Sequence, residues 1–156
     1  MPVEFHDYSV EVKKALQERA IEYLETAGLV MQRQAANNTR VGFGQTAGKW
    51  DYAVDDDKQV CTVGNPLENA IWEEFGTGEF ALEGKGRKGA WYVPVDGYTG
   101  KKRPTYNGRV VVVYGKDGKK YYKTNGKKPT RALHNAFVTK KNALIQLAER
   151  IFGELK

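Results

Sequence analysis

Two segments with helical periodicity, one near each end of the chain, enclose a middle that is rich in strand and turn signals. In the first, apolar residues recur at intervals of three and four: Val12, Leu16, Ala20, Tyr23, Leu24, Ala27 and Met31. In the second, the same spacing joins Leu133, Ala136, Phe137, Leu144, Leu147, Ala148, Ile151 and Phe152. Such stripes are typical of amphipathic helices that bury one face. We predict a first helix from about Val10 to the mid-thirties, capped by Ser9, and a last helix docked on a sheet.

The middle of the chain predicts the strands of that sheet. Residues 59–63 and 90–95 are strand-like, and Pro94 favours a sheet edge because it has no N–H to donate. Two further runs, 109–114 and 119–124, flank the turn-forming sequence Gly-Lys-Asp-Gly and predict a β-hairpin. Residues 67–75 favour a short helix, whereas residues 40–50 are ambiguous between a strand and a loop.

The predicted fold is therefore α+β: an antiparallel sheet packed against a long N-terminal helix and a C-terminal helix, with a protruding basic β-hairpin. At 156 residues and 40% hydrophobic composition, the chain suits a single domain over residues 1–156. It has no apolar run of about 18 residues and no secretory layout at its start, so we expect no membrane span and synthesis in a cytoplasm. Cys61, the single cysteine, allows no internal disulfide, and we interpret it as a packing residue.

Charge is distributed unevenly along the chain. Residues 1–84 hold 7 Lys and Arg against 15 Asp and Glu, whereas residues 85–131 hold 14 against 2. An acidic first half and a basic middle can make complementary contacts between copies, because each subunit of a head-to-tail ring presents two different surfaces. The basic segment could also face phosphate, and the alternative without a function is a set of solvated loop and hairpin faces.

Several apparent chemical motifs lack the context that their chemistry needs. Residues 84–89 fit the pattern G-x-G-x-x-G but precede a predicted strand, whereas a dinucleotide site lies between a strand and a helix. The three aspartates at 55–57 lack the glycine and the distal glutamate of a calcium loop. His6 and His134 are far apart, and Ser9 has no catalytic partners. We therefore predict no enzyme activity, no cofactor and no metal.

Two short segments are more specific. Residues 69–78 (NAIWEEFGTG) run an apolar stretch into a Gly-Thr-Gly break, which predicts a sharp corner that turns Trp72 and Phe75 toward the core. Residues 126–137 (GKKPTRALHNAF) begin the last helix; Pro129 suits a helix start, and Thr130 can cap the turn that follows.

In this order, the two segments resemble those of the tail-completion, or head-tail joining, proteins of long-tailed bacteriophages and prophages. The family's stretch after the first helix is matched poorly by residues 37–50. The resemblance implies a structural virion protein of the phage neck, made in the host cytoplasm, that forms a ring between the head connector and the tail around the DNA channel. Its expected partners are further copies of itself, in a hexamer or dodecamer, the connector or stopper, the tail tube or terminator, and the genomic DNA.

On that hypothesis the expected assembly residues lie in the two segments: Glu73, Glu74, Phe75, Gly76, Thr77, Gly78, Gly126, Pro129 and Arg131. The basic hairpin is expected to contact DNA in the lumen or a protein partner, through Arg109, Lys116, Lys119, Lys120 and Lys123.

Two other functions stay open. One is the tail terminator of the adjacent ring. The other is non-specific nucleic-acid binding by the hairpin lysines together with Lys127, Lys128, Tyr121 and Tyr122. Because side chains alternate along a strand, adjacent Tyr121 and Tyr122 cannot both join one binding face. A hydrolase or nuclease is disfavoured, since no nucleophile or metal set is visible.

Overall fold

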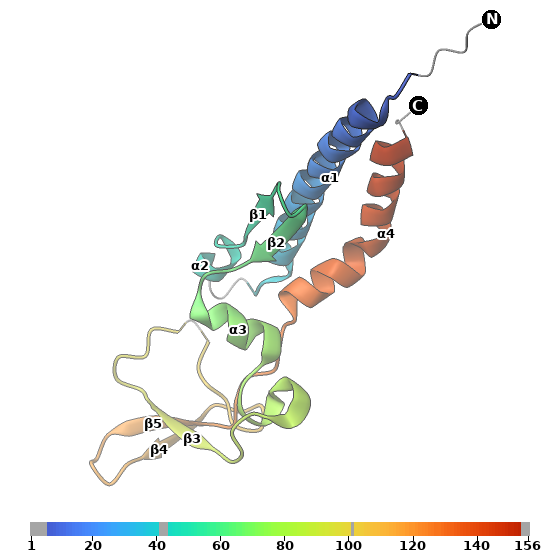
Figure 1. Ribbon diagram of the computed structural model, residues 1–156. Coiled ribbons are helices and arrows are strands. Elements are labelled where there is room, and N and C mark those ends of the chain that lie inside the picture. The colour runs from blue at the N-terminus through green and yellow to red at the C-terminus, as the bar shows by residue number, and fades with distance from the viewer. Residues whose placement is uncertain (1–5, 41–43, 101, 154–156) are drawn as a thin grey trace, which may run out of the picture.

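The computed structural model describes residues 6–40, 44–100 and 102–153, and it confirms an α+β fold with a long helix near each end and antiparallel sheets (Figure 1). The helices are α1 (Ser9–Asn38), α2 (Gly44–Ala47), α3 (Glu68–Phe75) and α4 (Ala132–Gly153). The strands are β1 (Asp51–Asp55), β2 (Val60–Gly64), β3 (Trp91–Pro94), β4 (Val111–Tyr114) and β5 (Lys120–Thr124). Two 3-10 turns, η2 (Gly78–Phe80) and η3 (Leu82–Gly84), follow α3.

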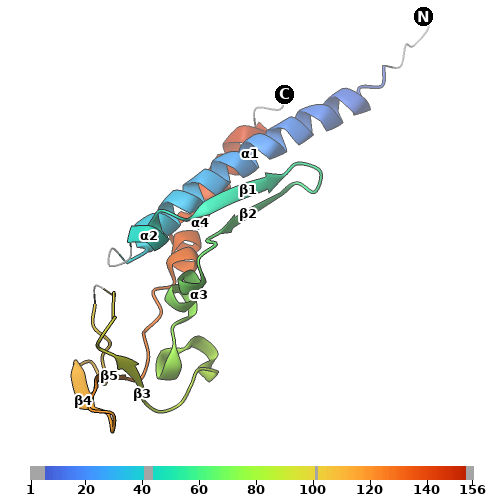
Figure 2. The ribbon, with the colours of Figure 1, turned by 90° about the vertical axis from the view of Figure 1, so that its left-hand side faces the viewer.

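The molecule is elongated and has two parts, which we call the arm and the head. The arm consists of α1 and α4 side by side, with the β1–β2 hairpin against α1; the head is the three-stranded sheet of β3, β4 and β5 with its loops (Figures 1 and 2). Helix α3 lies between them. The expected single sheet is thus divided in two. The prediction that the last helix docks on a sheet was wrong, because α4 packs on α1 and leaves Phe137 of its stripe exposed.

The first helix begins one residue earlier than predicted, and Ser9 is not its cap. The residue before the helix is Tyr8, which provides no side-chain cap, and the carboxylate of Asp7 accepts a hydrogen bond from the Ser9 backbone N–H at 2.9 Å. Further along, Gly28 lies so close to the β1–β2 hairpin that a Cβ there would come within 2.8 Å of the Cys61 sulfur. This contact supports the interpretation of Cys61 as a packing residue.

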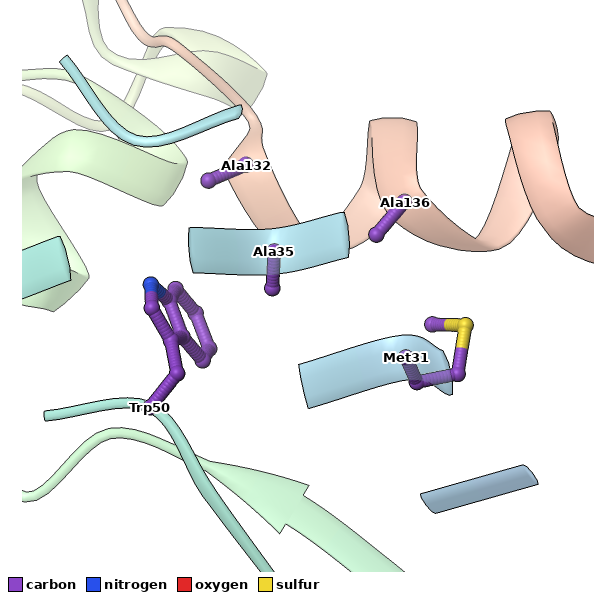
Figure 3. Packing of buried hydrophobic residues seen from close by; sticks show 5 residues of the cluster. All are labelled: Met31, Ala35, Trp50, Ala132 and Ala136. Carbon is purple, nitrogen blue, oxygen red and sulfur yellow. The ribbon is translucent and has the colours of Figure 1, made fainter. Parts of the chain in front are cut away.

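The core of the arm is small and gathers around Trp50 (Figure 3). Met31, Ala35, Ala132 and Ala136 pack with it, and the three alanines allow α1 and α4 to approach closely. The indole N–H of Trp50 donates to the hydroxyl oxygen of Thr39 at 2.7 Å, so its polar atom is satisfied.

The segment that brings Trp50 to this core was ambiguous in the sequence. It contains the short helix α2, residues 41–43 lie outside the described residues, and the strand β1 that follows was not predicted.

The head sheet agrees with its prediction. Strand order is β3-β5-β4, with all pairs antiparallel, so β3 and Pro94 lie at an edge. The hairpin turn is closed by hydrogen bonds from the Gly115 N–H to the Lys119 carbonyl oxygen at 2.9 Å and from the Gly118 N–H to the Gly115 carbonyl oxygen at 3.0 Å.

The elongated shape leaves an unusual amount of surface. The accessible area is 11375 Å², whereas a compact monomer of this mass exposes about 7,900 Å². If each of the twelve residues outside the described part is allotted about 160 Å², an excess of about 1,600 Å² remains. In the described part, no helix combines the length and the apolar composition needed to cross a bilayer.

Candidate assembly site

The two sequence signatures meet in space, although about fifty residues separate them. The Thr77 N–H donates to the Lys127 carbonyl oxygen at 2.9 Å, and the Lys127 N–H returns a bond to the Thr77 carbonyl oxygen at 3.3 Å. One step along, the Glu79 N–H donates to the Asn125 carbonyl oxygen at 3.0 Å. These bonds form a short antiparallel pairing outside the named strands. We call this unit, residues 73–79 with residues 125–134, the junction, since it joins the arm to the head.

Three glycines make the pairing possible. Gly76, Gly78 and Gly126 have φ angles of +73°, +61° and +119°, where a side chain is strained. Space is also lacking: a Cβ on Gly76 would lie 2.8 Å from Pro129, and one on Gly78 would lie 2.6 Å from the Trp91 ring. The sharp corner predicted after Phe75 is therefore confirmed, and its glycines are required by close packing as well as by backbone torsion.

Glu73 holds the junction together from a buried position, with 3% of the residue exposed. Lys127 Nζ donates to its Oε1, and the Thr130 hydroxyl donates to its Oε2 at 2.7 Å. Its backbone carbonyl oxygen accepts the N–H groups of Thr130 at 2.6 Å and Arg131 at 3.3 Å. Burial raises the pKa of Glu73, but the hydrogen bonds from Lys127 and Thr130 and the charges of Lys127 and Arg40 outweigh it and lower the pKa below its ordinary value of 4.5.

Glu74 caps the last helix across the junction. Its carboxylate accepts the free N–H groups of Leu133 at 2.9 Å and His134 at 3.0 Å, at the positive end of the helix dipole. The prediction that Thr130 provides this cap was wrong, because the Thr130 hydroxyl is bonded to Glu73 instead. A carboxylate distant in sequence can replace a local cap, since it offers the same acceptor atoms.

Arg131 has a positive φ of +55°, which is uncommon for a residue with a side chain. The N–H of Asn135 donates to the Arg131 carbonyl oxygen at 2.8 Å, and its side-chain amide donates to the Thr130 carbonyl oxygen at 3.0 Å. The C-terminal end of α1 also contributes, since Asn38 Nδ2 donates to the Ala132 carbonyl oxygen at 3.0 Å. These three hydrogen bonds hold the backbone direction at the start of α4.

The apolar side of α3 is exposed, contrary to the prediction that Trp72 and Phe75 turn toward the core. Trp72 is 53% exposed and Phe75 is 54% exposed, and Ile71 beside them is exposed as well. The buried face of α3 instead holds Ala70 and Glu73. Exposed aromatic residues grouped on one helix are typical of a contact surface with another protein.

The basic hairpin does protrude, but its cations do not gather on one face. Lys116 and Lys119 lie in and beside the turn, whereas Lys120 and Lys123 lie on opposite faces of β5, over the rings of Tyr114 at 5.8 Å and Tyr106 at 4.1 Å. Arg109 precedes β4 and is bridged to Tyr106 through the backbone.

The two adjacent tyrosines of β5 also separate, as alternation predicts. Tyr122 is buried, while the Tyr121 hydroxyl donates to Asp117 at 2.7 Å.

Two of the remaining sequence motifs, the acidic turn and the glycine-rich loop, make contacts within the chain. At the acidic turn after β1, Lys58 forms an ion pair with Asp55 at 2.7 Å. Gly86 of the glycine-rich loop packs against the backbone of Gly78, which gives this glycine a packing role. In the described ranges, no group of three or more potential metal ligands comes together.

Asn125 was not predicted as a site residue from the sequence. It is buried directly after β5, where the two segments of the junction meet. Its side-chain amide donates to Glu79 Oε2 at 2.8 Å and to Asn107 Oδ1 at 3.1 Å. The sequence signal that could have identified Asn125 is its position at the end of a predicted strand and directly before Gly126. Comparison with protein-family models, curated proteins and solved structures finds no match for this chain.

Proposed function

We propose that this protein is a structural component of a phage neck, where copies form a ring that joins the head connector to the tail around the DNA channel. The observation that carries the proposal is the unburied surface. The excess of about 1,600 Å² equals the area that two neighbours would cover, since a standard interface removes about 800 Å² from each partner. Two different neighbours per subunit are what a ring requires.

The charge distribution supports contacts between unlike surfaces. The basic segment builds the head, whereas the arm, residues 6–64 with 132–153, holds 10 acidic and 10 basic residues, and α3 adds three further acidic residues. Two basic heads placed against each other would repel, whereas the head of one copy placed against the acidic residues of α1 or α3 in the next copy would bring opposite charges together. That the assembly is a phage neck is inferred from the sequence resemblance. The two segments that carry this resemblance form one hydrogen-bonded junction in the structure.

The first prediction concerns assembly in solution. We expect the isolated protein to be a folded monomer or a weak oligomer that enlarges to a closed ring when its connector or tail partner is added. Raising the salt concentration should weaken association, because the complementary charges are largely exposed. Native mass spectrometry at increasing salt measures both effects. A salt-insensitive dimer that never enlarges with neck partners present would contradict the proposal.

Virion assembly provides the functional test. Cells that produce the phage without this protein should accumulate DNA-filled heads and unattached tails, visible by electron microscopy. Normal virions in its absence would rule out a role in joining.

The second prediction concerns DNA and separates the neck from a dedicated nucleic-acid-binding protein. A ring through which a duplex moves needs only weak contact, so the isolated protein should bind labelled duplex weakly and lose that binding between low and physiological salt. The divergent faces of Lys120 and Lys123 favour this outcome. Sub-micromolar, sequence-dependent affinity at physiological salt would favour the nucleic-acid function instead.

A further inference from the structure

A groove of about 620 Å³ opens between α3 and the head sheet, beside the junction. Its lining includes the aromatic residues Trp72 and Phe80, Trp91 of β3, and Lys102 and Arg103 of the loop that follows β3. Four junction residues, Thr77, Gly126, Lys127 and Lys128, form part of its lining. Grooves of this size commonly hold ligands.

The groove is strongly cationic. Its described lining includes Arg40, Lys102, Arg103, Lys127 and Lys128, and none of the described lining residues is acidic. Two of these cations already have partners, since Arg40 donates to the Lys128 carbonyl oxygen at 3.2 Å and Lys127 is bonded to Glu73. No salt bridge within the described residues involves Lys102 or Arg103, which are exposed, so the groove is suited to an anionic ligand.

The aromatic lining favours a polypeptide over single-stranded nucleic acid. Stacking of successive bases needs several free ring faces. Arg87 lies over Trp91 at 5.6 Å and Lys128 over Phe80 at 5.7 Å, whereas Trp72 is exposed. Tyr98 packs edge-on against Tyr122, with ring centroids 5.5 Å apart. An acidic polypeptide segment with apolar side chains does not need a free aromatic ring face for stacking. Its carboxylates could pair with the cations, and its apolar groups could contact Trp72.

One end of this same chain has that chemistry. Around the start of α1, Asp7 and Glu11 are exposed together with Tyr8, Val10 and Val12, of which Tyr8 is 62% and Val10 is 74% exposed. No lysine or arginine occurs between residues 6 and 12. This end lies at the far tip of the arm, away from the head (Figures 1 and 2). A chain therefore cannot place it in its own groove.

We propose that the groove binds the N-terminal end of α1 from a neighbouring copy of the chain. Asp7 and Glu11 pair with Lys102 and Arg103, and the apolar side chains cover Trp72. The contact joins two different surfaces, so repetition closes a ring or extends a filament. The inference rests on the proposed ring and gives it a specific subunit contact.

A charge exchange tests the contact. Variant A carries Lys102→Glu and Arg103→Glu in the groove, and variant B carries Asp7→Asn and Glu11→Lys on the arm; Asn at position 7 keeps the acceptor for the Ser9 N–H. Each alone should associate at least about tenfold more weakly than the parent, because like charges then face each other. An equal mixture should recover association. The acidic end of α1 in variant A then meets the basic groove of variant B, and the basic end of α1 in variant B meets the acidic groove of variant A. Sedimentation velocity at low salt measures this, with thermal unfolding as the check on folding.

The matched control is Lys116→Glu with Lys119→Glu on the exposed hairpin turn, which changes the net charge as variant A does. It should associate within about threefold of the parent. The contact is contradicted by a parent that stays monomeric at all concentrations, by variant A matching this control, or by a mixture that fails to recover. Binding of a single-stranded oligonucleotide that only variant A abolishes, with self-association unchanged, would make the groove a nucleic-acid site. If association depends on these charges but phage heads and tails still join in the absence of the protein, the contact would be supported and the neck function contradicted.

Discussion

Replacing Gly76 and Gly78 together by Val should lower the melting temperature by about 10 °C or more, or prevent folding. A β-branched residue at positive φ costs about 1–2 kcal/mol per site. At these two sites the new Cβ atoms would also press on Pro129 and on the Trp91 ring, where a glycine leaves no spare room. We therefore expect a total loss above about 3 kcal/mol, which is a large share of the stability of one domain. Thermal unfolding followed by circular dichroism measures it.

Gly118→Val is the matched control for this double variant. Gly118 has a φ of +74°, similar to that of Gly76, but nothing lies within 4 Å of a Cβ built there. The control should therefore lose only the torsional part, about 1–2 kcal/mol. If the double variant is as stable as the parent and gives a normal virion yield, the corner is neither strained nor needed. Charge reversals of the hairpin lysines should leave the fold intact in the same measurement.

Glu73→Ala should destabilise the protein by about 3 kcal/mol. Removing one partner of a buried ion pair typically costs about 3–5 kcal/mol, because the remaining charge loses its compensation. The side chain of Lys127 keeps 34% exposure and can regain water, which places the expected loss near the lower end. The Thr130 hydroxyl also loses its acceptor. Urea unfolding gives the free energy, and Glu68→Ala on the exposed first turn of α3 is the control, expected to lose less than about 1 kcal/mol. Equal losses in the two variants would show that the buried pair contributes nothing specific.

The same carboxylate gives an acid-sensitive term to stability. Because the pKa of Glu73 is lower in the folded state than its ordinary value of 4.5, its contribution is complete above that value and is lost as the pH falls through the folded pKa. The stability difference between the parent and Glu73→Gln should therefore be constant near neutral pH and shrink below about pH 4.5. Thermal unfolding from pH 7 to pH 3 tests this, and a difference that stays constant to pH 3 would contradict the assigned pKa shift.

Local chemistry was sufficient to predict most of the elements. The long helix at each end follows from three-and-four spacing of apolar residues, and the β4–β5 hairpin follows from glycines that close its turn. Pro94 at a sheet edge follows from its missing N–H. Each of these signals depends on residues within one turn or one strand of each other, so no knowledge of distant contacts is needed.

The tertiary structure decided which faces are buried and which distant groups meet. An apolar stripe does not reveal its partner, so α4 packs on α1, and Trp72 and Phe75 remain at the surface of α3. From the sequence, Glu73 and Glu74 were expected to be assembly residues. The approach of residues 125–134 makes Glu73 a buried partner of Lys127 and Glu74 the cap of α4. The physical reason is that a hydrogen bond or an ion pair depends on distance in space, and spacing along the chain determines that distance only within a single element.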